Sequence, residues 1–313
     1  MGVGLGPTLF SPRFLPLSFA SPAGYNGWMS LPYRLLFLDL DGTLIGHDDV
    51  ISPRTLDTLH RAQQQGCILV ICTGRSRHAA QHIAAQIGGE GGYGIASNGS
   101  VVFQWNHPRP IQKSTLSEPV TWEAIRLARA HGLAPLCLGL EDDDRVICAD
   151  RSFPLPPSYM SVQGSRLLFC DDVLQEIAVR DALPMSIDVH GEDERDVARL
   201  TQVWRQAFGA GAAVYHCFVE RFACWGAFLN PAETGKARAA QWVAEALGVP
   251  REQTLAIGDY LNDLDLLQWA GLGVCMGDGH ADVRACAGHV TGTLAEDGVA
   301  QALERFVLRE LGA

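Results

Sequence analysis

Short apolar runs alternate with helix-like segments along residues 34–97. Continuous apolar runs are typical of strands buried on both faces of a parallel sheet, and Ser52 before Pro53 and Gly66 further on are typical helix-start and helix-stop residues. The predicted elements are a strand RLLFLDL (34–40), a helix 53–65, a strand CILVIC (67–72), a helix 77–87 and a strand YGIAS (93–97). This order predicts βαβ units and a parallel sheet.

The same rhythm returns near the carboxyl end of the chain. The predicted elements are a helix 234–247, a strand TLAIG (254–258), a helix 263–270, a strand GVCM (273–276) and helices near 280–286 and 297–310. Both ends of the chain are therefore expected to build one sheet.

The middle of the chain has shorter strands with hairpin-like pairing. Strands are predicted in APLCLGL, RVICAD, SRLLFCD, SIDVHG, AAVYHCFVE and FACWGAFL, and helices near 118–131, 172–181 and 192–208. The chain is predicted to have an α/β fold, in which residues 31–108 and 227–313 form a Rossmann-like parallel-sheet core. Residues 109–226 are predicted to form an inserted α+β domain.

Residues 1–30 are rich in Gly, Pro and Ser and show no helix or strand period. We expect a disordered extension there. Met29 is a candidate natural start, because the first strand begins only a few residues later; an amino-terminal sequence of the native protein that begins at Met1 would refute this.

Charge and hydropathy exclude two classes of partner. The formal net charge of -11 and the pI near 5.3 disfavour nucleic-acid binding, which needs clustered Lys and Arg. No apolar run reaches the roughly 20 residues of a membrane-spanning helix. We expect neither a nucleic-acid nor a membrane partner, and a monomer or homodimer.

Nine cysteines without repeating spacing indicate reduced thiols in a cytoplasmic protein. Cys217 and Cys224, with His216, are an alternative metal site. However, CFVERFAC lacks the CxxC spacing, and a hairpin explains it as well.

Polar residues that could take part in catalysis or binding fall at the carboxyl ends of predicted strands, where open parallel sheets bind their ligands. Asp39 and Asp41 end the first strand, Thr73 in CTGR ends the second, Lys236 in TGKARAAQW opens a helix and Asp259 in IGDYLND ends a late strand. We expect them to converge on one crevice.

These residue types suit phosphoryl chemistry. Asp39 and Asp41, two apart on an extended segment, would point the same way and serve as nucleophile and general acid or base. Asp259 and Asp263, four apart, would add oxygen ligands for Mg²⁺. Gly42 would let the loop close tightly.

Thr73 and Lys236 would hold the oxygens of a phosphoryl group. Each motif alone has an ordinary explanation, because Asp-Gly and Thr-Gly are common turns and a lysine near a helix start is usually a surface charge. DLDGTL followed by GDYLND, each ending a strand, is far more specific.

With these motifs the chain resembles the haloacid dehalogenase superfamily, and specifically its Cof-type branch of phosphatases, whose large cap domain lies between the second and third motifs. DLDGTL resembles motif I, ICTGR motif II, Lys236 motif III and GDYLND motif IV. SNGS (97–100), residues 273–290 and EDGVAQAL (296–303) are also family-like. The resemblance covers nearly all of residues 33–310.

The resemblance implies a mechanism. Asp39 would attack phosphorus to form an aspartyl-phosphate, while Asp41 protonates the leaving alcohol and later activates water. Mg²⁺ would be held by Asp39, the backbone carbonyl of Asp41 and Asp259, with Asp263 in support. The implied substrate- and phosphate-binding residues are Gly42, Thr73, Gly74, Arg75, Asn98, Lys236 and Asn262.

The expected activity is Mg²⁺-dependent hydrolysis of small phosphorylated metabolites, with sugar phosphates favoured. A phosphomutase with the same nucleophile and a non-catalytic phosphosugar-binding protein are the alternatives. Three positions depart from the family pattern: Tyr260 replaces a small residue, Asp278 replaces an asparagine and Lys236 is not followed by glycine. The cap candidates for specificity are Asp188, His190, Tyr215 and Trp225, although simple packing explains each of them singly.

Overall fold

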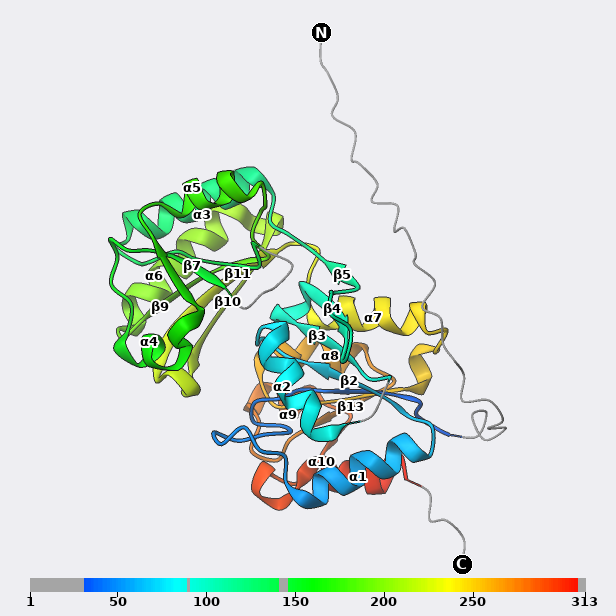
Figure 1. The fold of residues 1–313 in the computed structure, drawn as a ribbon. Helices are drawn as coiled ribbons and strands as arrows, with labels where there is room; N and C mark the ends of the chain where they lie inside the picture. Colours follow the sequence, from blue (N-terminus) through cyan, green and yellow to red (C-terminus); the bar gives the residue numbers. More distant parts are fainter. Residues whose placement is uncertain (1–30, 89–90, 141–145, 309–313) are drawn as a thin grey trace, which may run out of the picture.

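The computed structural model describes residues 31–88, 91–140 and 146–308, which form two lobes (Figure 1). The predicted extension 1–30, including Met29, lies outside the described residues. The core lobe contains an eight-stranded sheet in the order β14-β13-β12-β1-β2-β3-β4-β5. Its strands are β1 (Leu35–Leu38), β2 (Ile68–Cys72), β3 (Tyr93–Ala96), β4 (Val101–Gln104), β5 (Gln112–Lys113), β12 (Thr254–Gly258), β13 (Leu272–Cys275) and β14 (His289–Val290).

Strand β1 lies inside this sheet and is buried on both faces. It pairs in parallel with β2 and β12, and all four of its residues are fully buried. Leu36 and Leu38 pack into the cluster of α1, α2 and α10, whereas Leu35 and Phe37 pack into the cluster of α7, α8 and α9. The helices are α1 (Pro53–Gln64), α2 (Arg77–Ile87), α7 (Lys236–Ala246), α8 (Leu264–Trp269), α9 (Ala281–Cys286) and α10 (Gly298–Phe306). The predicted α/β class is confirmed.

The cap lobe consists of a six-stranded sheet, in the order β10-β11-β9-β6-β7-β8, and its helices. The strands are β6 (Leu136–Leu138), β7 (Ile147–Asp150), β8 (Leu167–Cys170), β9 (Ser186–Gly191), β10 (Ala212–Val219) and β11 (Cys224–Pro231). The helices are α3 (Glu118–Ala130), α4 (Pro157–Gln163), α5 (Val173–Arg180) and α6 (Glu194–Phe208). Trp204 is fully buried among apolar side chains of α3, α6 and the sheet.

The structure moves both predicted limits of the insertion by a few residues. Strand β5 belongs to the core sheet beyond residue 109, and β11 stays in the cap sheet to Pro231, beyond residue 226. The two residues of β5 are too few to show a strand period in the sequence. Strand β11 continues without a break to Pro231, where the chain passes from the cap lobe back to the core lobe. That each lobe is an independent domain stays a prediction.

No helix among the described residues combines the length and the apolar character needed to cross a membrane.

Candidate active site

The carboxyl edge of the core sheet brings together an aspartate and a lysine that are 197 residues apart. Asp39 follows β1, and its backbone N–H donates to the Ile257 carbonyl of β12 at 3.0 Å. Lys236, the first residue of α7, donates from Nζ to Oδ1 of Asp39 and to Oδ1 of Asp263, each at 2.6 Å. All three charged side chains are buried. Lys236 is therefore an internal cation, not a surface charge.

Asp259 and Asp263 complete this acidic cluster from the loop after β12. Oδ2 of Asp263 accepts the backbone N–H groups of Asp259 and Tyr260, each at 3.2 Å. The Thr43 hydroxyl donates to Oδ1 of Asp259 at 3.2 Å. Asp263 thus shapes the loop that carries Asp259 as well as sharing Lys236.

Burial and mutual repulsion control protonation in the cluster. Burial, and then repulsion from Asp263, raise the pKa of Asp39 well above its usual range in spite of Lys236. The same two causes raise the pKa of Asp259 to about 7. Burial alone would lower the pKa of Lys236, but Asp263 and Asp39 hold it above its usual value. One ammonium therefore leaves three carboxylates with excess negative charge.

Asp39, Asp259 and Asp263 could together hold a metal ion. One carboxylate oxygen from each lies within 4.8 Å of the others. Such an all-oxygen set suits a hard divalent cation, and the excess negative charge fits one too.

Asp39 and Asp41 do not lie on an extended strand, so the geometric reason for expecting them to point the same way is wrong. That both carboxylates face one substrate stays a prediction. Strand β1 ends at Leu38, and the chain turns at once, with later loop N–H groups bonding back to the Leu40 carbonyl. The Asp39 side chain is 7% exposed, whereas that of Asp41 is 56% exposed. The two carboxylates have different environments, which suits different roles in one reaction.

Gly42 is required by this turn for two reasons. Its φ of 77° lies in the left-handed region, where glycine is favoured. A Cβ at this position would also lie 2.5 Å from Oδ2 of Asp259, so a side chain would displace that carboxylate.

The other predicted phosphate-binding residues form a connected group. The Asn98 N–H donates to the Thr73 carbonyl at 3.1 Å, and Asn262 Nδ2 donates to Oδ1 of Asn98 at 3.4 Å. A Cβ on Gly74 would meet Oδ1 of Asn98 at 3.1 Å. Because Asn262 precedes Asp263, this group adjoins the acidic cluster. The phosphate-binding roles of its members stay predictions.

Arg75 links Asp41 to Asp49 and, through Asp49, to Arg221, two residues that no sequence motif marks as part of the site. Its guanidinium donates from Nε to Oδ2 of Asp41 at 2.8 Å and from Nη2 to Oδ1 of Asp49 at 2.7 Å. Arg221, in the turn between β10 and β11, donates from Nη1 to Oδ2 of Asp49 at 2.7 Å. In the sequence, Asp49 and Arg221 resemble ordinary loop charges, since their pairing spans 172 residues.

Tyr260 and Asp278, which depart from the family pattern, lie in different surroundings. The Tyr260 side chain is partly exposed, and its ring lies edge-on to His280 at 5.5 Å. Burial raises the pKa of Tyr260, and the neighbouring negative charges of Cys217, on cap strand β10, and of Asp259 add to this effect. Asp278 is exposed, and its Oδ2 accepts the Leu294 N–H at 3.3 Å, outside the acidic cluster.

The cap candidates lie on opposite faces of the cap sheet. The strand register places Tyr215 on the same face as the buried Asp188 and His190. Trp225 lies on the other face, where it stacks on His216 with ring centroids 5.4 Å apart.

The alternative Cys–His metal site is not formed in the described part of the chain. The predicted hairpin is present as β10 and β11, with Val219 opposite Cys224, which places Cys217 and Cys224 on one face. His216, next to Cys217, points to the other face. The Cys224 thiol lies instead 3.6 Å from Nδ1 of His190.

Asp188 is expected to make stability depend on pH. Burial raises its pKa to about 7, and within the described residues its Oδ1 has no hydrogen-bond partner. Between about pH 4 and 7 the folded state keeps a proton that the unfolded state releases, so the free energy of unfolding falls as pH rises through this window. Asp188→Asn should stabilise the protein by roughly 1–3 kcal/mol at about pH 8 and much less at about pH 5, as measured by urea unfolding. An equal effect at both pH values would contradict this, and Asp196→Asn, an exposed cap carboxylate, is the control.

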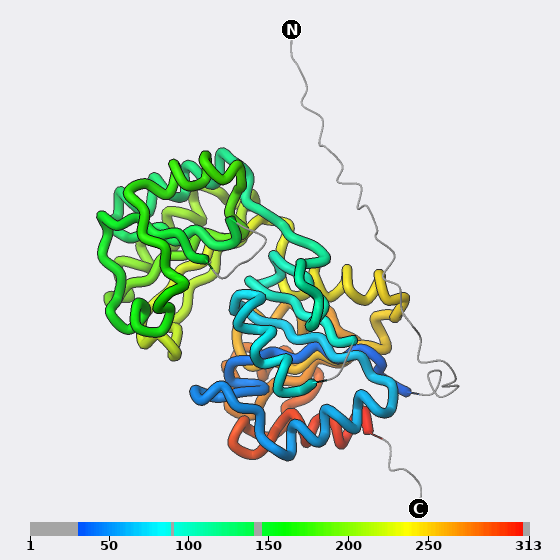
Figure 2. The backbone as a smooth tube through the Cα atoms, viewed as in Figure 1, coloured from blue at the N-terminus to red at the C-terminus, as the bar shows by residue number. Residues whose placement is uncertain are grey.

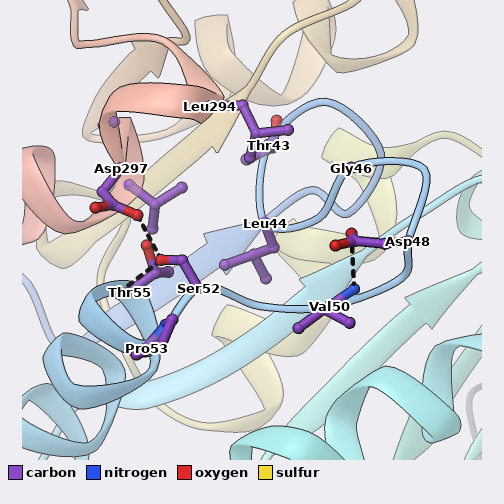
Figure 3. A pocket seen from close by; sticks show the side chains of 12 residues that line it. Thr43, Leu44, Gly46, Asp48, Val50, Ser52, Pro53, Thr55, Leu294 and Asp297 are labelled. Atoms are coloured by element: carbon purple, nitrogen blue, oxygen red, sulfur yellow. Dashed lines mark hydrogen bonds between the residues drawn. The ribbon is translucent and has the colours of Figure 1, made fainter.

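A cavity of about 340 Å³ borders the loop that follows Asp41. Figure 3 shows its walls, which come from this loop and from the starts of α1 and α10, with Ser52 hydrogen-bonded to Asp297. Thr43 lines the cavity, yet its hydroxyl bonds Asp259 of the cluster. The loop therefore borders the cavity and contacts the cluster.

The structure therefore combines an α/β core lobe, a cap lobe and an acidic cluster at the carboxyl edge of the core sheet. Residues 36–303 match the haloacid dehalogenase-like hydrolases, and the chain belongs to this family. The predicted family and the predicted enzyme class are confirmed.

Two curated relatives are named phosphatases. The chain is 28% identical over 289 residues to the 5-amino-6-(5-phospho-D-ribitylamino)uracil phosphatase YitU of Bacillus subtilis (strain 168), covering 88% of this chain and 97% of that protein. It is 25% identical over 318 residues to Phosphatase YwpJ of the same organism, covering 88% and 100%. A solved haloacid dehalogenase-like hydrolase from Bacteroides thetaiotaomicron is similar with a TM-score of 0.72 and 27% identity, covering 87% and 99%.

Proposed function

We propose that this protein is a Mg²⁺-dependent phosphatase that hydrolyses small phosphorylated metabolites, with sugar phosphates favoured, through an aspartyl-phosphate on Asp39. The observation that supports this most is the acidic cluster. A buried Asp39 lies at the carboxyl end of β1, bonded to Lys236 and surrounded by more carboxylates than one lysine neutralises.

In the proposed reaction Lys236, Asp39 and Asp41 have different roles. Lys236 holds Oδ1 of Asp39, which leaves Oδ2 to attack phosphorus. The bond from phosphorus to the ester oxygen breaks, and the leaving oxygen takes a proton from Asp41. Water then attacks the aspartyl-phosphate and gives a proton to the Asp41 carboxylate, which releases phosphate and restores Asp39.

Asp39, Asp259 and the backbone carbonyl of Asp41 would hold Mg²⁺, with Asp263 in support. When bound, the cation supplies positive charge that offsets the cluster and the substrate phosphate. Thr73, Asn98 and Lys236 would hold the phosphoryl oxygens.

The names of two relatives support a phosphorylated sugar or polyol as substrate. YitU and YcsE of Bacillus subtilis (strain 168), 28% and 24% identical to this chain, are both named 5-amino-6-(5-phospho-D-ribitylamino)uracil phosphatases. In that compound the phosphate is carried by a ribityl chain. We extend this substrate class to the present protein.

A panel of phosphorylated sugars and polyols tests the proposal. With Mg²⁺ we expect release of inorganic phosphate from at least one ester, loss of release in EDTA and recovery on adding excess Mg²⁺. Undiminished rates in chelator would refute the metal requirement. Isomerisation without phosphate release would favour the phosphomutase, and Mg²⁺-dependent binding without turnover would favour the binding protein.

The cytoplasmic location and the monomeric or dimeric state also stay predictions. All nine cysteines are free thiols in the structure, which a reducing compartment would maintain.

A further inference from the structure

Four charged side chains alternate in sign from the active site to the cap lobe. Asp41 contacts Arg75, Arg75 contacts Asp49, and Asp49 contacts Arg221 of the cap. The Arg75 guanidinium bonds both oxygens of Asp41 and one oxygen of Asp49, and Arg221 takes the other Asp49 oxygen. We call these four residues the ion-pair chain.

The inner members of the ion-pair chain are held in place. The side chains of Arg75 and Asp49 are 11% and 24% exposed. Asp49 has a φ of 57°, and its carbonyl accepts Nε2 of Gln86 from α2 at 2.6 Å. Partial burial acts to raise the pKa of Asp49, but the bonds and charges of Arg75 and Arg221 lower it overall, so its charge is stabilised by both neighbours.

These contacts of Asp49 help to hold its loop in position. One side of the loop borders the cavity in Figure 3 and so lacks close packing there. On the other side it extends toward the turn between β10 and β11, as the tube trace shows (Figure 2). The cap makes a second contact at the neighbouring position, where Arg166 Nη2 donates to the Ser76 hydroxyl at 2.9 Å.

We propose that Asp49 and Arg221 are positioning residues for Asp41, so that the cap turn helps to set where the acid–base carboxylate lies. This rests on the proposed function, in which Asp41 transfers the proton. Asp49 orients the Arg75 guanidinium, because one planar group must satisfy two carboxylates at once. Arg221 in turn fixes Asp49. Removing either one takes away a contact that helps to orient Arg75, so that Arg75 and Asp41 move together from the productive position.

Leaving-group dependence separates this role from a general structural one. An alkyl phosphate needs its leaving oxygen protonated, whereas p-nitrophenol leaves as a stabilised anion without help from an acid. The value of kcat/KM covers the steps up to cleavage of the ester bond. A misplaced Asp41 should therefore lower kcat/KM for alkyl esters more than for p-nitrophenyl phosphate.

The experiment uses the full chain with Mg²⁺ and compares p-nitrophenyl phosphate with the alkyl phosphate that the wild type hydrolyses fastest. For Asp49→Asn and Arg221→Gln we expect the ratio of kcat/KM, alkyl over aryl, to fall about 3- to 10-fold. The double variant should be no worse than the worse single variant, because both break the same chain of contacts. Arg221→Lys should recover part of the ratio.

The matched controls are Asp48→Asn, beside Asp49 in the same loop, and Arg195→Gln, an exposed arginine of cap helix α6. Both should keep the wild-type ratio. An unchanged ratio in Asp49→Asn and Arg221→Gln, or additive losses in the double variant, would overturn the proposal.

Hydrogen exchange gives a readout that does not depend on turnover. Amides of residues 41–50 should exchange faster in Arg221→Gln than in the wild type or in Arg195→Gln. If the wild type hydrolyses no phosphate ester, the proposed function fails on its own. Equal exchange of these amides in Arg221→Gln and wild type would instead overturn the proposed positioning role of Arg221.

Discussion

Asp39→Asn is expected to lower kcat by at least about 10³-fold while leaving the protein as stable as the wild type or more stable. The catalytic loss follows because an amide does not attack phosphorus and is a poor metal ligand. Stability is kept because burial and repulsion from Asp263 raise the pKa of Asp39, so at neutral pH its ionised form opposes folding. Phosphate release and urea unfolding without metal measure the two effects.

Asp57→Asn is the matched control, because the Asp57 side chain on α1 is 71% exposed. It should leave both activity and stability unchanged. Full activity of Asp39→Asn would disprove the nucleophile. A large loss of stability would show that Lys236 needs the charge of Asp39 as well as that of Asp263.

Lys236→Met should abolish activity and lower the free energy of unfolding by about 3–5 kcal/mol. The substitution leaves the carboxylates of Asp39 and Asp263 buried without their shared cation. Mg²⁺ should stabilise this variant more than it stabilises the wild type, because a bound cation would supply the missing positive charge. Urea unfolding with and without Mg²⁺ measures both effects.

The control uses the only other lysine of the sequence, Lys113 on edge strand β5. Lys113→Met should change stability far less and should keep activity. A Lys236→Met protein that is as stable as the wild type would contradict the role of Lys236 as the internal cation of the cluster.

The strand ends of the core sheet could be predicted because strands buried on both faces are continuous apolar runs in the sequence. Strands such as β1 and β12 are buried on both faces, so their apolar runs are continuous and stop where the chain leaves the sheet. Asp39 and Asp259 stand just beyond those stops. Since neighbouring parallel strands end at one edge, the convergence of these two residues followed from the order of elements.

Alternation along a strand was a poorer guide. It predicted an extended segment through Asp39 and Asp41, but the strand ends at Leu38 and the chain turns at Gly42, and the two carboxylates differ in exposure. The edge strand β5 was missed for a related reason, because two residues are too few to show a period.

The sequence by itself determined the fold class, the family and the residues of the acidic cluster, because periodicity and strand-end motifs are local properties of the chain. Only the tertiary structure decided which charges pair. Lys236 joins Asp39 to Asp263, and Arg75 joins Asp41 to Asp49 and the cap. An ion pair depends on a distance of a few ångströms between side chains, and that distance exists only after remote segments have packed.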